Sequence, residues 1–306
     1  MNSFILNGAM RETRFLIIGG DGLIGAALNE SIRLQEGSVT STSRHHRDAS
    51  RNTLFLDLQD EKSVSALDIS GYAVAYFCAG LSKYSDVGAN VSISQMINVT
   101  NTLHLCARLT EAGCSIVFLS TSAVFDGKRP YPAETDPGCP ITHYGQQKCE
   151  VENVLTAPEK MPDASGAVKI VRLSKVLVPN TPLINGWRNS LSRGKTITPF
   201  LDLRLSPVSL PYVVDGLLKI GMLEQSGVFH LSGARDVTYA DIAKGLAMRW
   251  GYPLNLIHPV TSMNSGISLP YAPRHPSLGM ARTAKLAAII PQLFEDCLAD
   301  LADAAA

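Results

Sequence analysis

A tyrosine and a lysine four residues apart, Tyr144 and Lys148, form a pair that could move a proton. On a helix, side chains at positions i and i+4 lie on the same face, so the two would be neighbours. A lysine ammonium beside a phenol lowers the pKa of the tyrosine from about 10, which makes the tyrosine a usable proton donor or acceptor. The spacing alone is weak evidence, because an ordinary surface tyrosine and lysine would show it too.

Three hydroxyl side chains, Ser120, Thr121 and Ser122, follow the apolar run 115–119, which is typical of a buried strand. A hydroxyl at the end of a strand can hydrogen-bond a substrate carbonyl and hold it against a cofactor. A cluster of serine and threonine is by itself more often a helix cap or a turn. A catalytic role for these hydroxyls is favoured because a glycine-rich loop precedes them and Tyr144 and Lys148 follow them in the sequence.

The glycine-rich loop lies between the apolar run 15–18 and a helical pattern that begins at Leu23 and Ile24. Gly19, Gly22 and Gly25 fit the pattern G-x-x-G-x-x-G. Glycines here allow a tight turn and a close approach of the backbone to a pyrophosphate, and the helix N-terminus supplies N–H donors. The context predicts a dinucleotide-binding loop, and an ordinary turn is the alternative.

The residues at the end of the second predicted strand indicate which dinucleotide the loop would bind. NAD sites usually place an acid there to hold the ribose hydroxyls, but here the residues are Ser43 and Arg44, with no acid before Asp48. A guanidinium binds a 2′-phosphate in a fork, so NADP is expected and NAD is less favoured. The alternative is a solvated basic loop.

An acid also follows the third predicted strand. Asp57, with Leu58 beside it, could accept a hydrogen bond from the adenine amino group. The alternative is that Asp57 is an acid at a helix N-terminus, where a negative charge is favourable.

Short apolar runs alternate with helical patterns through the first half of the chain. Strands are expected at 15–18, 38–43, 53–56, 74–77, 115–119 and 168–173, and helices at 23–35, around 64–67, at 93–112 and at 143–155. Strands separated by helices predict an α/β fold with a doubly wound parallel sheet, the Rossmann architecture. Ligands of such sheets bind at the carboxyl ends of the strands.

The pattern changes after Leu177, where prolines recur and the alternation weakens. We therefore expect a dinucleotide-binding domain at 1–177 and a smaller substrate-binding lobe at 178–306. A strand at 228–231 and a helix at 239–250 are expected in the second half, with some of its elements returning to the core of the first.

Composition excludes several classes of protein. Of 306 residues, 45% are hydrophobic and 18% charged, and the formal net charge is zero, which excludes intrinsic disorder and argues against a nucleic-acid binder. No apolar run is long enough to span a membrane, and the start does not resemble a signal peptide. The six cysteines are scattered without a C-x-x-C pair, and the histidines show no metal spacing, so we expect reduced thiols, a cytoplasmic location and no catalytic metal.

The chain resembles the extended short-chain dehydrogenases/reductases, and in particular their dTDP-4-dehydrorhamnose reductase branch. The segments that carry the resemblance are Gly19 to Gly25, Asp57-Leu58, Cys78-Ala79-Gly80, Asn98 to Thr102, Leu119 to Gly127, Tyr131 to Pro137, Tyr144 to Lys148 and Gly227 to Gly233. Those most specific to the branch are Val124 to Gly127 and His230 to Gly233.

The resemblance implies a catalytic trio of Thr121, Tyr144 and Lys148. Tyr144 would protonate the nascent alkoxide, and Lys148 would tune Tyr144 and hold the nicotinamide ribose. The further positions that it implies are Cys78, Ala79, Gly80 and Asn98 around the cofactor, and Ser122, Val124 and Arg274 for the substrate.

The function that the resemblance implies is NADPH-dependent reduction of a nucleotide-linked 4-keto-6-deoxy sugar. One alternative is a nucleotide-sugar epimerase or dehydratase that retains NAD. The other is a non-catalytic, NADP-binding regulatory subunit. A homodimer is expected from the family.

Overall fold

The computed structural model describes residues 8, 10–45, 52–161, 165–265 and 271–303. Contacts divide the chain into two interleaved units. The first comprises 1–124, 140–172 and 214–229, and the second comprises 125–139, 173–213 and 230–306. This division differs from a single boundary after Leu177, because each half of the chain contributes a segment to the other unit.

A seven-stranded sheet in the order β10-β6-β5-β4-β1-β2-β3 forms the centre of the fold. Its strands are β1 (Arg14–Ile18), β2 (Ser38–Ser43), β3 (Thr53–Phe55), β4 (Val74–Phe77), β5 (Ser115–Thr121), β6 (Val168–Leu173) and β10 (Gly227–Leu231). Strand β1 pairs in parallel with both β2 and β4, so the strand order reverses between them. The expected doubly wound Rossmann sheet is confirmed, and the strand expected at 228–231 is its edge strand, β10.

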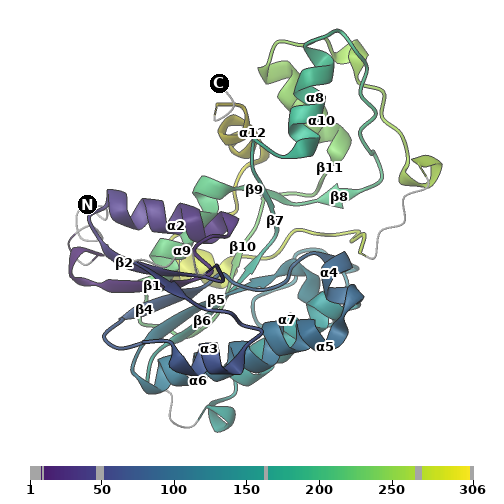
Figure 1. The fold of residues 1–306 in the computed structure, drawn as a ribbon. Coiled ribbons are helices and arrows are strands. Elements are labelled where there is room, and N and C mark those ends of the chain that lie inside the picture. Colours follow the sequence, from purple (N-terminus) through teal and green to yellow (C-terminus); the bar gives the residue numbers. More distant parts are fainter. Residues whose placement is uncertain (1–7, 9, 46–51, 162–164, 266–270, 304–306) are drawn as a thin grey trace. The chain divides into compact units, whose positions relative to one another are not determined.

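Helices cover both faces of this sheet (Figure 1). Figure 1 shows α2 (Leu23–Leu34) and α9 (Leu210–Gly221) on one side and α3 (Glu61–Ala66), α6 (Asn101–Glu111) and α7 (His143–Leu155) on the other. Two short helices, α4 (Tyr84–Ala89) and α5 (Val91–Gln95), precede α6. Because both faces are covered, strands such as β4 are buried along their whole length.

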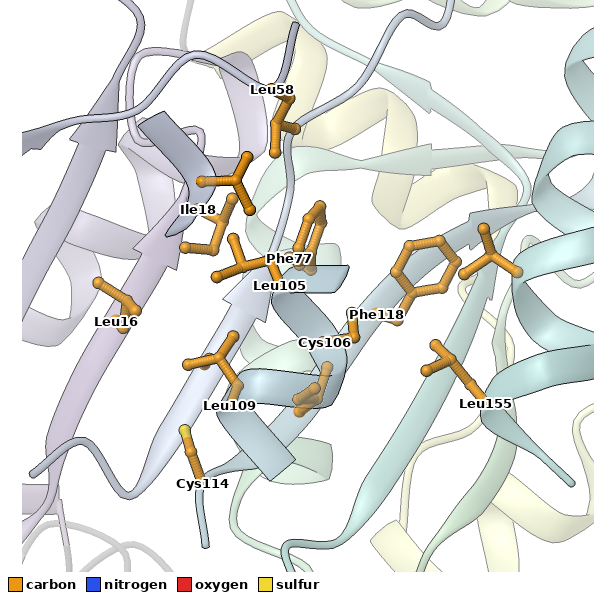
Figure 2. Packing of buried hydrophobic residues seen from close by; sticks show 14 of the residues in the cluster. Leu16, Ile18, Leu58, Phe77, Leu105, Cys106, Leu109, Cys114, Phe118 and Leu155 are labelled. Carbon is orange, nitrogen blue, oxygen red and sulfur yellow. The ribbon is translucent and has the colours of Figure 1, made fainter. Parts of the chain in front are cut away.

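The core between the sheet and helices α3, α6 and α7 is apolar (Figure 2). Leu16, Phe77 and Phe118 from the strands pack against Leu105 and Leu109 of α6, and each of these side chains is fully buried. This packed layer thus anchors β1, which leads into the glycine loop, β5, which ends in Thr121, and α7, which carries Tyr144 and Lys148.

One predicted helix is interrupted. The pattern at 93–112 suggested a continuous helix, but the structure places a π-helical turn at Met96–Thr100 between α5 and α6. The turn contains the buried Asn98, whose side chain bonds with Leu81 instead of facing solvent. Turns of this kind are frequent at functional sites.

The second unit has its own core and two small sheets. Strand β7 (Lys175–Leu177) pairs in parallel with β9 (Pro207–Ser209), and β8 (Arg204–Leu205) pairs antiparallel with β11 (Val237–Thr238). Its helices are α8 (Pro182–Leu191), α10 (Tyr239–Arg249), α11 (Ala281–Ala287) and α12 (Phe294–Asp303). The apolar cluster that joins α8, α10 and α12 includes Trp187, Leu246 and Leu298.

Candidate active site

The glycine loop has the geometry that a pyrophosphate requires. Gly19 has φ +85°, and a Cβ on Gly25 would lie 2.2 Å from the Gly19 carbonyl oxygen, so neither position admits a side chain without strain. The nearest atom to a Cβ on Gly22 would lie at 3.4 Å, so this position is open on the protein side. Gly22 caps α2 without a side-chain hydrogen bond, and the first turn of the helix is available to an anion.

A cleft of about 390 Å³ begins at this loop and lies within the first unit. Eight of the predicted cofactor residues line it, namely Gly19, Gly22, Arg44, Asp57, Leu58, Cys78, Ala79 and Gly80. The five others (Leu23, Ile24, Gly25, Ser43 and Asn98) do not line the cleft and lie in the elements that form it. The residues present therefore fit a dinucleotide.

The wall of the cleft beside β2 carries one basic and one acidic side chain, Arg44 and Asp21. Arg44 is exposed and lines the cleft. Ser43 is buried, and its hydroxyl donates to the Asp21 carboxylate at 3.4 Å. Asp21 also lines the cleft and was not expected from the motif, in which its position is variable. Asp48, the first acid after Arg44 in the sequence, lies outside the described residues, as does Arg47.

Asp57 is held at the rim by the loop after β3. Its carboxylate accepts a hydrogen bond from the Gln59 amide at 2.9 Å, and its own amide donates to the Ser63 hydroxyl at 2.9 Å. The N-cap of α3 is Asp60 and not Asp57. The acid at the N-terminus of α3 is therefore Asp60, and Asp57 does not cap that helix. The contact of Asp57 with adenine stays a prediction.

The three members of the predicted trio lie on neighbouring elements of the first unit. Strand β5 continues past the expected end at Leu119 and closes with Thr121 itself. Helix α7 begins at His143, because the Thr142 hydroxyl caps the helix by accepting a hydrogen bond from the Gly145 amide at 3.1 Å. A Cβ on Gly145 would lie 2.2 Å from the Ala123 carbonyl oxygen, so glycine lets α7 approach the turn after β5.

Tyr144 and Lys148 interact with different partners. The Lys148 ammonium donates to the Leu119 carbonyl at 2.9 Å and lies 4.3 Å from the centre of the Phe118 ring. The Tyr144 ring meets Tyr84 edge-on, with 5.9 Å between ring centres. The lysine is thus fixed to the end of β5, next to Ser120 and Thr121.

The expected effect of Lys148 on Tyr144 is not found. Burial, and secondly the neighbouring Tyr84, raise the pKa of Tyr144 above its usual value. Burial also lowers the pKa of Lys148 to about 8, although Glu152 opposes this. The expectation neglected desolvation, which disfavours the charged form of both groups. A phenol with a raised pKa is protonated at neutral pH and is a weaker acid than a free tyrosine.

Asn98 connects the cofactor cleft with α7. Its side-chain amide bonds with the backbone of Leu81 in both directions, at 2.8 and 3.0 Å, and donates to Gln147 at 2.8 Å. Leu81 lines the cleft and Gln147 precedes Lys148. Asn98 therefore acts from beneath the cleft and positions the loop after β4.

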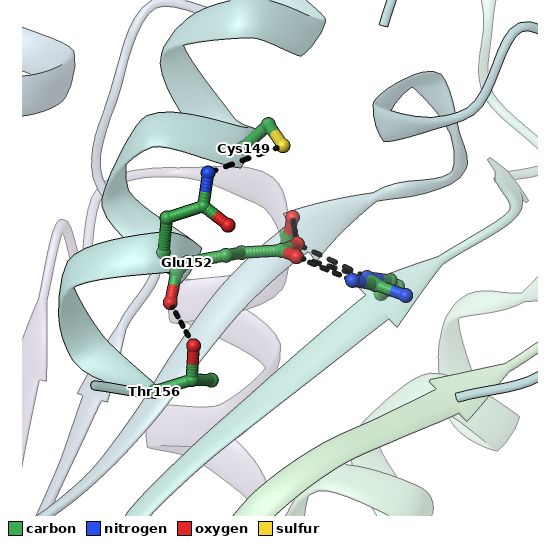
Figure 3. A network of polar contacts seen from close by, with 6 residues as sticks. Cys149, Glu152 and Thr156 are labelled. Carbon is green, nitrogen blue, oxygen red and sulfur yellow. Dashed lines mark hydrogen bonds and ion pairs between the residues drawn. The ribbon is translucent and has the colours of Figure 1, made fainter. Parts of the chain in front are cut away.

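Two features of the site had no signal in the motifs. Lys83 lines the cleft beyond Cys78, Ala79 and Gly80, and only its place after the fourth strand could have indicated it. The second is a buried network around Glu152 on α7 (Figure 3). Glu152 accepts from Arg172 of β6 at 2.7 Å and from the Ser120 hydroxyl.

The three predicted substrate residues differ in exposure. Ser122 is half-buried and opens the turn after β5, whereas Val124 is fully buried, so its side chain supports the turn from inside. Arg274 is exposed and belongs to the second unit. Its neighbour His275 donates its amide to the Gly127 carbonyl at 2.8 Å, so the Arg274 segment rests on the loop after Val124.

A family model supplies the identification. The model described as the RmlD substrate binding domain matches residues 13–306. The chain belongs to this family. Membership confirms the resemblance to the dTDP-4-dehydrorhamnose reductase branch and, at the level of the family, the prediction of an oxidoreductase.

Named relatives cover most of this member of the RmlD family. A dTDP-4-keto-6-deoxy-D-glucose reductase from Streptomyces niveus is 27% identical over 81% of this chain and 83% of its own. A methionine adenosyltransferase 2 subunit beta from Danio rerio is 25% identical over 83% of this chain and 79% of its own. The structure of a dTDP-4-dehydrorhamnose reductase from Bacillus anthracis str. Ames in complex with NADP matches with a TM-score of 0.77 and 19% identity, over 94% and 98% of the two chains. This last match shows the fold.

Two features are absent from the described residues. These residues contain no helix that is long and apolar enough to cross a membrane. In the same part of the chain, no three or more His, Cys, Asp or Glu side chains are grouped as metal ligands.

Proposed function

We propose that the protein is an NADPH-dependent reductase of a nucleotide-linked 4-keto-6-deoxy sugar. The observation that carries the proposal is that Lys148 of α7 bonds to Leu119 of β5, the strand that ends in Thr121, in the unit that also holds the cleft. The named sugar reductases among the relatives support the substrate class.

NADPH would be held by the glycine loop and the N-terminus of α2, with Arg44 on its 2′-phosphate. When bound, it supplies the hydride. Arg44 lines the cleft, which supports a preference for NADPH over NADH. Asp57 would accept from the adenine amino group.

The trio would complete the reduction by delivering a proton. Tyr144, like any tyrosine protonated at neutral pH, would donate its proton to the substrate oxygen as negative charge develops there. Thr121 accepts from the Ala123 amide at 3.1 Å through its oxygen, so its hydroxyl hydrogen can point to the same substrate oxygen. Lys148 would stabilise the charge that Tyr144 acquires and bind the nicotinamide ribose.

Residues of the second unit would bind the substrate's nucleotide part. Arg274 suits the diphosphate, because guanidinium groups bind phosphate oxygens in pairs. Ser122 would contact the sugar. We further propose that the protein is a homodimer that acts in the cytoplasm.

The test is oxidation of NADPH and NADH at 340 nm with enzymatically generated dTDP-4-keto-6-deoxy sugars. Turnover that prefers NADPH is expected. The absence of turnover with every such sugar, for a protein that nevertheless binds NADPH, would reject the reductase.

A second function has a specific observation in its favour. Relatives named methionine adenosyltransferase 2 subunit beta match this chain about as well as the reductases do, so a regulatory subunit that binds NADP is the competing proposal. It predicts a stable complex with another enzyme and no turnover. The presence of Thr121, Tyr144 and Lys148 on neighbouring elements of the first unit supports the reductase.

A further inference from the structure

Glu152 is a buried carboxylate of α7 that the proposed chemistry does not use. It lies four residues beyond Lys148 and eight beyond Tyr144, so the three side chains follow one face of the helix. Its side chain is 4% exposed. A carboxylate is buried this deeply only when its charge is compensated.

The compensation comes from two strands of the sheet (Figure 3). The Arg172 guanidinium of β6 donates through Nε at 3.0 Å and through Nη2 at 2.7 Å to Oε2 of Glu152. The Ser120 hydroxyl of β5 donates to Oε1, and Ser120 is the residue before Thr121. Glu152 therefore ties α7 to β5 and β6 beside the trio.

We infer that Glu152 is a positioning residue that keeps Lys148 cationic and holds α7 against the end of β5. The consequence for turnover rests on the proposed reductase function, but the effect on Lys148 does not. The Arg172 guanidinium lies at hydrogen-bond distance from the Glu152 carboxylate and compensates for its burial.

The surroundings of Lys148 show why it needs this anion. It faces the Cys78 thiol after β4, the Cys106 thiol of α6, and the Phe118 ring and Leu119 carbonyl of β5. The thiols carry no charge near neutral pH, because burial raises the pKa of each to about 12. Glu152 is then the anion that supports the Lys148 ammonium, and it opposes the effect of burial.

The alternative is that Glu152 and Arg172 form an ion pair with a purely architectural role. Such a pair would change the stability of the protein when it is broken. It would leave the titration of Lys148 in the folded protein unchanged. The two roles are therefore separated by measuring the protonation of Lys148 itself.

The experiment is NMR titration of the full chain labelled with ¹³C at lysine Cε, with the Lys148 signal assigned by its loss in Lys148→Met. In Glu152→Gln, which keeps the shape and loses the charge, the titration midpoint of Lys148 should fall by about one pH unit or more from its value near 8. Lys169, whose pKa burial also lowers to about 8, lies on the opposite face of the sheet and should titrate unchanged. A midpoint for Lys148 that does not move would overturn the inference.

Three further variants keep the test decisive. Ser120→Ala removes a hydrogen bond to Glu152 but no charge, so Lys148 should titrate as in the unaltered protein. If Glu152→Gln does not fold because Arg172 is left uncompensated, the double variant Glu152→Gln, Arg172→Gln removes both charges. The Lys148 midpoint should still fall, but by less than in the single variant, because the repulsion from Arg172 is lost together with the attraction of Glu152. Glu152→Asp, which restores the charge, should bring the midpoint back toward that of the unaltered protein.

The effect of Glu152 on catalysis is measured separately, from the pH profile of kcat/KM. In Glu152→Gln, the alkaline limb of the pH profile of kcat/KM should move to lower pH by the same amount as the Lys148 midpoint. An unaltered protein without turnover would reject the proposed function and leave the titration result standing. An active enzyme whose alkaline limb does not follow Lys148 would reject the role of Glu152 in the reaction.

Discussion

At the residue scale, the hydroxyl of Tyr144 is the group on which the proposed chemistry depends. Replacing it in Tyr144→Phe should lower kcat by about 10²–10⁴, because general acid catalysis contributes about that much. The affinity for NADPH, measured by its fluorescence, should change little. Tyr84→Phe is the matched control, since it keeps the edge-on ring contact and loses a hydroxyl that we assign no role. Near-normal turnover in Tyr144→Phe would show that another group donates the proton.

Arg44 is the single residue that we propose selects NADPH over NADH. Arg44→Ala should weaken NADPH binding by about 10- to 100-fold, since a hydrogen bond to a charged group contributes about 1.5–3 kcal/mol, and should leave NADH binding nearly unchanged. The dissociation constants of both cofactors measure this. Arg33→Ala, which removes an exposed arginine of α2 outside the cleft, should affect neither. Equal losses for both cofactors would mean that Arg44 does not contact the 2′-phosphate.

At the element scale, the approach of α7 to β5 depends on the absence of a side chain at residue 145. Gly145→Ala would place a Cβ 2.2 Å from the Ala123 carbonyl oxygen, and both atoms belong to rigid elements. The free energy of unfolding should fall by about 1–3 kcal/mol, and kcat should fall as Tyr144 is displaced from Thr121. Denaturant unfolding and steady-state kinetics measure the two effects.

The control for this substitution lies in another helix. Gly186 is inside α8 and has nothing within 4 Å of a Cβ position. Gly186→Ala should therefore raise the free energy of unfolding by about 0.4–1 kcal/mol, because alanine restricts the unfolded chain. If Gly145→Ala were equally stabilising, the close approach of α7 to Ala123 would not be a constraint.

At the scale of the whole molecule, buried titratable groups set the dependence of stability on pH. Burial lowers the pKa values of Lys148 and Lys169 to about 8, so the unfolded chain binds more protons above that pH and stability rises with pH. Burial raises the pKa values of four thiols to about 12, namely those of Cys78, Cys106, Cys114 and Cys297. Above about pH 9 the unfolded chain therefore loses protons that the folded chain keeps, and the free energy of unfolding falls.

The two trends together predict a maximum of stability between pH 8 and pH 9. Thermal unfolding in overlapping buffers from pH 7 to pH 10 should show Tm rising and then falling. Lys169→Met should flatten the rise, since it removes one of the two lysines. A Tm that falls steadily from pH 7 would show that neither lysine is neutralised by folding.

The sequence by itself determined the local features of this protein. The apolar runs of β1, β4 and β5 and the glycines at 19, 22 and 25 specify a strand, a turn and a helix through short-range sterics and burial, and the structure has all of them. The trio came from the resemblance to the reductase family and stays a prediction; the structure places Thr121 at the end of β5 and Tyr144 and Lys148 on α7.

Tertiary structure decided what depends on contacts between distant segments. Strand β10 joins the first unit, and residues 125–139 join the second, because hydrogen bonding and packing across the chain select their partners. The π-helical turn at Asn98 forms where that side chain reaches Leu81. The pKa of Tyr144 rises where the sequence suggested a fall, because desolvation depends on the buried surroundings and the spacing to Lys148 does not report them. The contacts of Glu152 with Ser120 and Arg172 also exist only once three elements are packed together.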